Sequence, residues 1–148
     1  MPRIHFLLAG LLLSVVSLGS DSAKEYDDET EHAGIEGRWL LTESGIETAK
    51  PYRGEAEVLS FRGRTFKFEY PISNKTSAGT CWTNPARVPH HLELTALSGN
   101  IKGRKFRWIY EIEGDTLRIA GDLDSAFERH PQAFNEKGLR IWVYKRAK

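Results

Sequence analysis

Short stretches in which apolar and polar residues alternate follow one another from Ile35 to the end of the sequence, with turn-forming residues between them. The turn signals recur at intervals of roughly eight to twelve residues, and no stretch shows the period of an amphipathic helix. This spacing favours an antiparallel sandwich or barrel over a sheet whose strands alternate with helices. We predict an all-β domain with eight strands, at about 36–44, 55–62, 64–71, 78–83, 91–97, 104–113, 115–121 and 139–146.

The clearest alternation is in "RKFRWIYEIEGDTLRIAG", which predicts a β-hairpin. Four apolar side chains fall on one face of its first strand, and four charged side chains fall mostly on the other, as in a sheet with one dry face. The apolar four are Phe106, Trp108, Tyr110 and Ile112, and the charged four are Lys105, Arg107, Glu111 and Glu113. Gly114-Asp115 makes a two-residue turn with glycine first, as a type II′ hairpin requires.

A second hairpin is predicted in "SFRGRTFKFEY", with its turn at Arg62-Gly63. Period-two alternation puts two apolar residues of its first strand opposite three of its second strand. The first pair is Leu59 and Phe61, and the three opposite residues are Phe66, Phe68 and Tyr70.

Two segments lack a clean strand pattern. Pro85 and Pro89 interrupt "GTCWTNPARVPHHLELTAL" and confine that stretch to a loop or a sheet edge. The segment 122–138, "DLDSAFERHPQAFNEKG", is the longest without a strand pattern, and we interpret it as a short helix or a lid-like loop. Loops of this kind often carry the function of a barrel protein.

The N-terminal residues have the layout of a secretory signal peptide, with one cation, Arg3, and an apolar run from Phe6 to Leu18. That run is shorter than the roughly 20 apolar residues that span a bilayer. We predict a signal peptide at 1–19, cleaved near residue 19, and a secreted or periplasmic protein, with an uncleaved membrane anchor as the alternative. Residues 20–34 hold six acids and one lysine, so we predict a disordered acidic linker before a barrel domain at 35–148.

Charge and cysteine content exclude several classes of protein. The segment 35–148 contains 19 Lys and Arg against 14 Asp and Glu, an excess too mild to recruit nucleic acid. We therefore expect no nucleic-acid partner, and no stable membrane insertion after signal cleavage. Cys81 is the only cysteine, so the chain forms no internal disulfide. Cys81 is either a half-buried small side chain or a thiol that pairs with a second chain.

The order of several short motifs resembles a known type of protein. Gly37-x-Trp39 at the start of a strand and Lys145-Arg146 at the end of the last one resemble the lipocalin pattern. The stretches "IEGRWLL", "GTCWTNPARVPHHLELT", "YEIEGDTLRIAG", "HPQAF" and "YKRAK" resemble, in this order, an uncharacterised lipocalin-like domain family of exported bacterial proteins first described in planctomycetes. The resemblance covers essentially all of 35–148, except that Cys81-Trp82 departs from the usual pattern. It implies a single antiparallel eight-stranded lipocalin-like (calycin-like) β-barrel and supplies no established activity.

In such a barrel three residues close one end and have a structural role. Gly37 lets neighbouring backbone approach at the closing strand. The indole of Trp39 plugs the bottom of the barrel, and Arg146 covers it by stacking and cation–π contact.

The barrel interior supplies the candidate ligand-binding residues. An eight-stranded barrel is just wide enough to be filled by its own side chains or to hold one small ligand. The aromatic side chains predicted to point inward are Phe66, Phe68, Tyr70, Trp108 and Tyr110. Because these five consume much of the interior, both a packed core and a small pocket near the open mouth are compatible with the sequence.

The sequence shows no constellation for catalysis, metal or cofactor binding. His90-His91 are successive strand residues that point to opposite faces, so we predict no metal site there. The "DLDS" that begins at Asp122 lacks the later ligands of an EF-hand. Ser125, His130 and Asp124 share one loop without a nucleophile elbow, which we interpret as loop polarity rather than a catalytic triad. We predict that the protein is not an enzyme and takes no cofactor.

Two functions remain open. The first is an exported, non-enzymatic barrel that binds a small apolar or amphipathic molecule at its mouth. The second is a module that binds a protein or a polymer of the cell envelope, with a solid barrel as scaffold. Its contacts would come from the 122–138 segment, from Trp82 and from the cations of "KGRKFR" at 102–107. Outward cations of this kind are also common on any soluble sheet, where they protect it from pairing with another chain.

Overall fold

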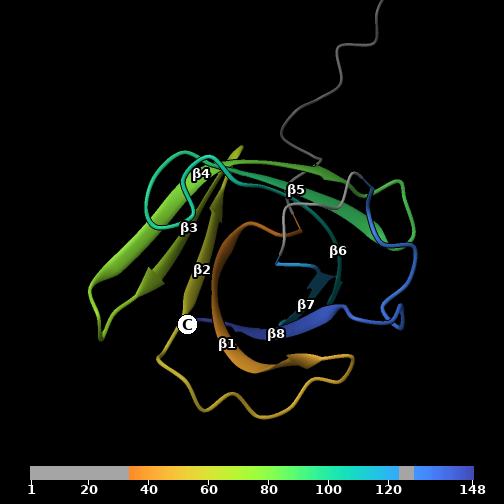
Figure 1. Ribbon diagram of the computed structural model, residues 1–148, viewed down its shortest axis with the longest axis horizontal. Helices are drawn as coiled ribbons and strands as arrows, with labels where there is room; N and C mark the ends of the chain where they lie inside the picture. The colour runs from red at the N-terminus through yellow and green to blue at the C-terminus, as the bar shows by residue number, and fades with distance from the viewer. Residues whose placement is uncertain (1–33, 124–128) are drawn as a thin grey trace, which may run out of the picture.

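Eight antiparallel strands, each hydrogen-bonded to the next in chain order, close into a barrel in the computed structural model, which describes residues 34–123 and 129–148 (Figure 1). The strands are β1 (Gly37–Ile46), β2 (Val58–Arg62), β3 (Thr65–Tyr70), β4 (Lys75–Asn84), β5 (His90–Ala96), β6 (Lys105–Glu113), β7 (Thr116–Gly121) and β8 (Arg140–Arg146). The described ranges contain no helix. The predicted all-β, eight-stranded antiparallel barrel is confirmed. The predicted signal peptide and, apart from Gly34, the predicted acidic linker lie outside the described residues.

The hairpin of β6 and β7 forms where alternation predicts it. Phe106, Trp108 and Tyr110 are buried in the barrel core. Gly114 and Asp115 connect the two strands, and Gly114 has a φ of 56°, which glycine adopts readily. The hairpin of β2 and β3 also forms, but its turn is Gly63-Arg64 rather than the predicted Arg62-Gly63. Arg62 still pairs with Thr65, so the glycine occupies the first turn position, with a φ of 52°.

The proline-containing stretch becomes a connecting loop between two full-length strands. β4 begins at Lys75, three residues before the prediction, and ends at Asn84, directly before Pro85. β5 begins at His90, directly after Pro89. Because the barrel is closed, these strands have neighbours on both sides, and the predicted alternative of a sheet edge does not apply.

Residues 129–138, the longer described part of the segment after β7, pack on the outside of the barrel. Phe134 packs against a second small apolar cluster, which contains Ile109, Ala120, Leu139 and Ile141. This cluster explains why Ile109, on the outward face of β6, has no exposed surface. We predicted a short helix or a lid-like loop for 122–138. The described residues of this segment form no helix, and 129–138 lie against the barrel wall, because Phe134 finds its apolar contacts there.

A β-bulge in β1 changes which of its residues point inward. Leu41 pairs with Tyr144 and Glu43 pairs with Val143, so Thr42 is an extra residue in β1. The Thr42 hydroxyl donates to the Val143 carbonyl over 3.0 Å. Beyond the bulge the inward positions shift by one, and Ser44 faces the interior at the open end of the barrel.

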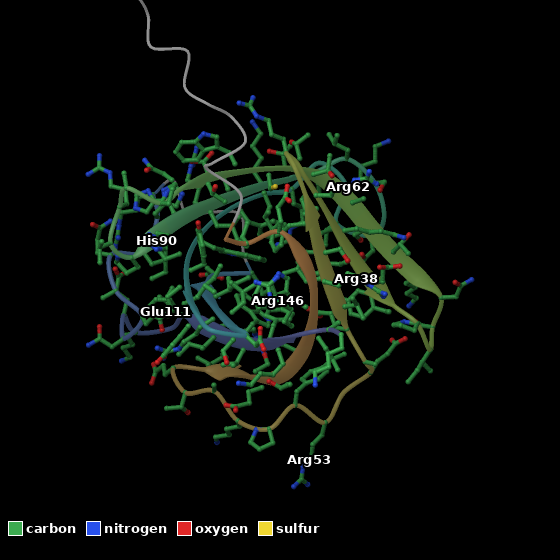
Figure 2. The ribbon with its side chains drawn as sticks, turned by 180° about the vertical axis from the view of Figure 1, so that it is seen from behind. Arg38, Arg53, Arg62, His90, Glu111 and Arg146 are labelled. Carbon is green, nitrogen blue, oxygen red and sulfur yellow. The ribbon has the colours of Figure 1, made fainter. Side chains whose placement is uncertain are left out.

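Arg146 and Trp39 close the other end. The Trp39 side chain has no exposed surface and its Nε1 donates to the Ile35 carbonyl over 2.8 Å. The guanidinium carbon of Arg146 lies 4.1 Å from the centre of the Trp39 ring, and Nη1 donates to the Glu36 carbonyl over 2.8 Å. Figure 2 shows Arg146 across the middle of the barrel at this end.

The structure gives a different reason for a glycine at position 37 from the one that its place in the strand indicates. Its φ is 117°, a conformation that other residues rarely adopt. A Cβ at this position would lie 2.9 Å from Nη1 of Arg146. The group that approaches Gly37 is therefore the Arg146 side chain and not the neighbouring backbone that the sequence predicts.

Candidate functional site

A cavity of about 260 Å³ lies at the open end of the barrel, which is the end that carries the connections 47–57, 71–74 and 97–104. One part of its wall is aromatic, and it is formed by Phe68, Phe106, Trp108 and Trp142. This volume is slightly below the range of typical ligand sites, and it corresponds to the space of roughly nine water molecules. The barrel is therefore not completely filled by its own side chains.

Three of the five predicted ligand-binding residues line this cavity, namely Phe68, Tyr70 and Trp108. Phe66 and Tyr110 do not line it, although both are buried in the core. β3 runs from the closed end to the open end, so Phe66 lies deeper than Phe68. β6 runs in the opposite direction, so Tyr110 lies deeper than Trp108. Period-two alternation predicts the face of a residue but does not predict its depth in the barrel.

The aromatic wall is held by specific contacts. The Trp108 and Trp142 rings are 4.8 Å apart, and the Phe106 and Trp108 rings are 4.9 Å apart. Trp108 Nε1 donates to the carbonyl of Asp122 over 2.9 Å. Gly121 makes room for this indole, because a Cβ there would lie 1.8 Å from Cδ1 of Trp108.

A buried carboxyl group, that of Glu57, belongs to the same cavity. Glu57 precedes β2 and is 7% exposed. Its Oε1 accepts a hydrogen bond from the Tyr144 hydroxyl over 2.6 Å, and its Oε2 accepts one from the Tyr70 hydroxyl over 3.0 Å. Burial raises the pKa of Glu57, and the two tyrosine hydrogen bonds oppose that shift.

The tyrosines around Glu57 are held in their protonated form. Burial and the charge of Glu57 raise the pKa of Tyr70 and also that of Tyr144, whose side chain is only 2% exposed. Burial and the same charge also raise the pKa of Tyr52, which lines the cavity from the β1–β2 connection. The hydroxyl groups of Tyr70 and Tyr144 are therefore hydrogen-bond donors to the carboxyl group at neutral pH.

Two arginines lie at the rim of the cavity. Arg140 is the first residue of β8, and its Nη1 donates to the Ser44 hydroxyl over 3.3 Å. Arg104 directly precedes β6; it donates to the Leu123 carbonyl, and its guanidinium carbon lies 5.3 Å from the Phe106 ring centre. Both side chains are half-buried. Of the cations in the predicted stretch 102–107, Arg104 is the one that lines the cavity.

The sequence pattern did not single out Glu57, Tyr144 or Arg140. A signal for Glu57 was present, because it shares the period-two face of Leu59 and Phe61. Arg140 and Tyr144 likewise fall, by period-two alternation, on the same strand face as Arg146, which was predicted to close the barrel. Their convergence on one cavity required the register of the closed barrel.

His91 contacts a histidine that lies far from it in the sequence. The rings of His91 and His130 are stacked, with their centres 3.9 Å apart and an angle of 11° between their planes. Nε2 of His130 lies 3.6 Å from a Glu93 oxygen. Burial lowers the pKa of both histidines, and the neighbouring His91 lowers that of His130 further. Among the described residues no group of three His, Cys, Asp or Glu side chains is arranged to hold a metal ion.

Of the other candidate reactive groups, the structure describes Cys81, which does not line the cavity. Ser125 and Asp124 lie outside the described residues, so the structure describes no triad geometry for them. Cys81 is a buried free thiol, and burial raises its pKa to about 11. Its Sγ lies 3.6 Å from the Gly63 carbonyl, near the closed end. A thiol with this pKa is a poor nucleophile at neutral pH.

Comparison of the chain with protein-family models, curated proteins and solved structures gives no match. The resemblance to lipocalin-like domains stays a prediction from the sequence. In the part of the chain that the structure describes, no helix has both the length and the apolar character needed to span a bilayer.

Proposed function

We propose that this protein binds one small amphipathic molecule in the cavity at the open end of its barrel, without catalysing a reaction. The cavity itself carries the proposal, because about 260 Å³ stays open between aromatic side chains that otherwise pack the interior. Concave, mostly apolar sites with a few converging polar groups are typical of small-molecule binding. Glu57 and the rim arginines supply such polar groups here.

We also propose that the protein is exported and lipocalin-like. The signal-peptide pattern at 1–19 and the motif order over 35–148 support it. Export would place the barrel in the periplasm or outside the cell, where it would meet small molecules of the envelope. The N-terminal sequence of the protein recovered from its native host tests this part, since cleavage near residue 19 leaves a new N-terminus.

Titration of intrinsic tryptophan fluorescence with short fatty acids and small aromatic compounds tests binding. Trp108 and Trp142 line the cavity, so saturable quenching at micromolar ligand is the expected result. Trp82→Phe is the control variant, because Trp82 is 41% exposed on the outer wall and its removal leaves the cavity unchanged. Ile101→Trp fills the mouth with a larger side chain, and we expect it to abolish the heat of binding in calorimetry while the melt stays cooperative.

A second candidate is the module that binds a protein or an envelope polymer through its outer surface. The exposed Trp82 is the observation that favours it, since exposed tryptophans are common in interfaces. A flat fluorescence titration together with loss of an envelope partner in Trp82→Ala would support this function in place of the first.

A further inference from the structure

The cavity carries an acid and two cations on different parts of its wall. Along β8 the inward-facing residues follow one another as Arg140, Trp142 and Tyr144. Tyr144 in turn holds the Glu57 carboxyl group over 2.6 Å. Arg140 and Tyr144 are separated by about 13 Å along the strand. One wall of the cavity therefore leads from a cation, across an indole, to a buried carboxyl group.

Strand β6 shows the first part of the same order, from a cation at the rim to aromatic side chains. Arg104 directly precedes β6, and the next inward residues on that strand are Phe106 and Trp108. The two arginines are half-buried at the rim, whereas Glu57 is 7% exposed. The cavity is thus polarised, with a negative group inside and positive groups at the mouth.

We propose that the cavity selects a small aromatic acid with a hydrogen-bond donor at the end opposite its acid group. The donor, a phenol or an amine, reaches Glu57, and the anionic group meets Arg104 and Arg140. This inference rests on the proposed function, and it adds the chemical class of the ligand and its orientation.

The inner end accepts hydrogen bonds. Each oxygen of Glu57 receives one tyrosine hydroxyl, so each has a second lone pair for another donor. A purely apolar ligand would strip water from these lone pairs without replacing it, which costs free energy. A ligand that entered with its own carboxylate first would place two like charges side by side. A donor is the group that satisfies this end.

The outer end attracts an anion. A guanidinium group matches a carboxylate with two parallel hydrogen bonds, and the half-buried position of both arginines strengthens the interaction relative to open water. A ligand with a single cationic group would be repelled at this rim. The aromatic wall between the two ends favours a flat ring, which stacks on indole and phenyl groups. The volume limits the ligand to on the order of ten non-hydrogen atoms.

Four probes with one phenylpropyl skeleton separate these contributions by calorimetry on the full chain at neutral pH. The first, 3-(4-hydroxyphenyl)propionate, carries both the anionic group and the hydrogen-bond donor. The others are 3-phenylpropionate with the acid alone, 4-propylphenol with the donor alone, and propylbenzene with neither. We expect the first probe to bind about tenfold or more tightly than either single-ended probe, with propylbenzene weakest.

Two variants assign the ends of the ligand to the ends of the cavity. Glu57→Gln removes the inner charge and should weaken both phenols severalfold, while 3-phenylpropionate keeps or gains affinity. Arg140→Gln should weaken both acids severalfold and leave 4-propylphenol unchanged. Arg53→Gln is the matched control for charge, because Arg53 is exposed on the β1–β2 connection and points away from the barrel (Figure 2). Circular dichroism and thermal melts check that each variant is folded.

The outcomes separate this inference from the proposed function. Equal affinity for all four probes, or equal losses for all probes in both variants, would overturn the proposed ligand class and leave a nonselective binding cavity. If none of the four probes binds the wild-type chain, both the ligand class and the proposed function fail. Should Glu57→Gln not fold, the probe series on the wild-type chain and Arg140→Gln still decide the question.

Discussion

The hydroxyl group of Tyr144 lies 2.6 Å from Oε1 of Glu57, and this hydrogen bond joins the last strand of the barrel to the residue that precedes β2. The two residues are 87 positions apart in the sequence. Closure of the barrel between β1 and β8 brings them together, since Tyr144 pairs with Leu41 and the Leu41 amide donates to the Glu57 carbonyl over 3.1 Å. The most buried carboxyl group of the described chain is therefore fixed by the closure of the fold.

Glu57→Gln should stabilise the protein at neutral pH. The pKa of Glu57 is raised in the folded state, so between its ordinary value and the raised value the native state binds more protons than the unfolded state. The free energy of unfolding consequently falls as pH rises through that window, and a neutral amide avoids this loss. We expect the melting temperature to rise by a few degrees at neutral pH, which corresponds to roughly 1 kcal/mol. The difference should shrink as pH approaches 4.5, the ordinary pKa of a glutamate carboxyl group.

Thermal melts of wild type and Glu57→Gln across this pH range measure the effect. Glu113→Gln is a suitable control, because Glu113 is exposed at the end of β6. A Glu57→Gln variant that is less stable than wild type at every pH would show that the hydrogen bonds of the carboxylate outweigh its burial.

Tyr144→Phe should destabilise the protein by about 1–3 kcal/mol, because it leaves one oxygen of a buried carboxyl group without its donor. Tyr70→Phe is the matched comparison. Its hydroxyl makes the longer bond to Glu57, at 3.0 Å, and its side chain is only half-buried, so we expect a smaller loss. Chemical denaturation at neutral pH measures both values. Equal losses in the two variants would mean that the buried Tyr144 hydroxyl has no special role.

The His91–His130 pair should make the protein less stable in mild acid. Both histidines have lowered pKa values, so below about 6.5 the unfolded state takes up more protons than the folded state, and stability falls as pH drops. Arg87 and Arg107 act in the same direction as burial, whereas Glu93 opposes it. Because His130 belongs to the segment that packs on the barrel wall, we expect this segment to detach first.

His130→Gln should flatten this pH dependence, which hydrogen exchange of residues 129–138 and thermal melts between pH 5 and 7 will measure. His90→Gln is the control, because the ring of His90 packs against Tyr110, 5.2 Å away, rather than against a second histidine. An unchanged slope in His130→Gln would assign the acid sensitivity to other groups.

Gly37→Ala should destabilise the closed end by on the order of 1–3 kcal/mol, the range of a residue held in a strained backbone conformation. The φ of 117° is unfavourable for alanine, and the new Cβ would press on the Arg146 guanidinium that covers Trp39. Gly103→Ala has a similar backbone cost, since its φ is 85°, but nothing lies within 4 Å of its Cβ position. The difference between the two losses isolates the contact with Arg146, and a blue or red shift of Trp39 fluorescence should accompany only the first variant.

Much of the fold could be predicted from the sequence because its information is local. Alternation in β6 and β7, and a glycine in each of the two-residue turns at Gly63 and Gly114, determine strands and hairpins over a few residues. The prediction of the outer position of Lys105 and the inner position of Phe106 needed only the period of a strand. The Arg62-Gly63 turn was wrong by one residue, because turn position depends on the register with Thr65.

The site was harder to predict, because it depends on depth and closure. The sequence indicated that Phe66, Phe68, Trp108 and Tyr110 face inward, yet two of them lie below the cavity floor. The bulge at Thr42 shifts the inward face of β1, so a strict alternation assigns Ser44 to the outside. Likewise the contact between His91 and His130 depends on where a long connection packs, and local periodicity carries no information about that.

The indole N–H signals of the four tryptophans, followed by NMR during titration with 3-(4-hydroxyphenyl)propionate, test the binding site most directly. Trp108 and Trp142 line the cavity, whereas Trp39 lies at the closed end and Trp82 on the outer wall. We predict saturable shifts of the first two signals, assigned by Trp→Phe variants, while the signals of the other two stay in place. Shifts confined to Trp82, or no shift in any signal, would contradict a binding site at the open end of the barrel.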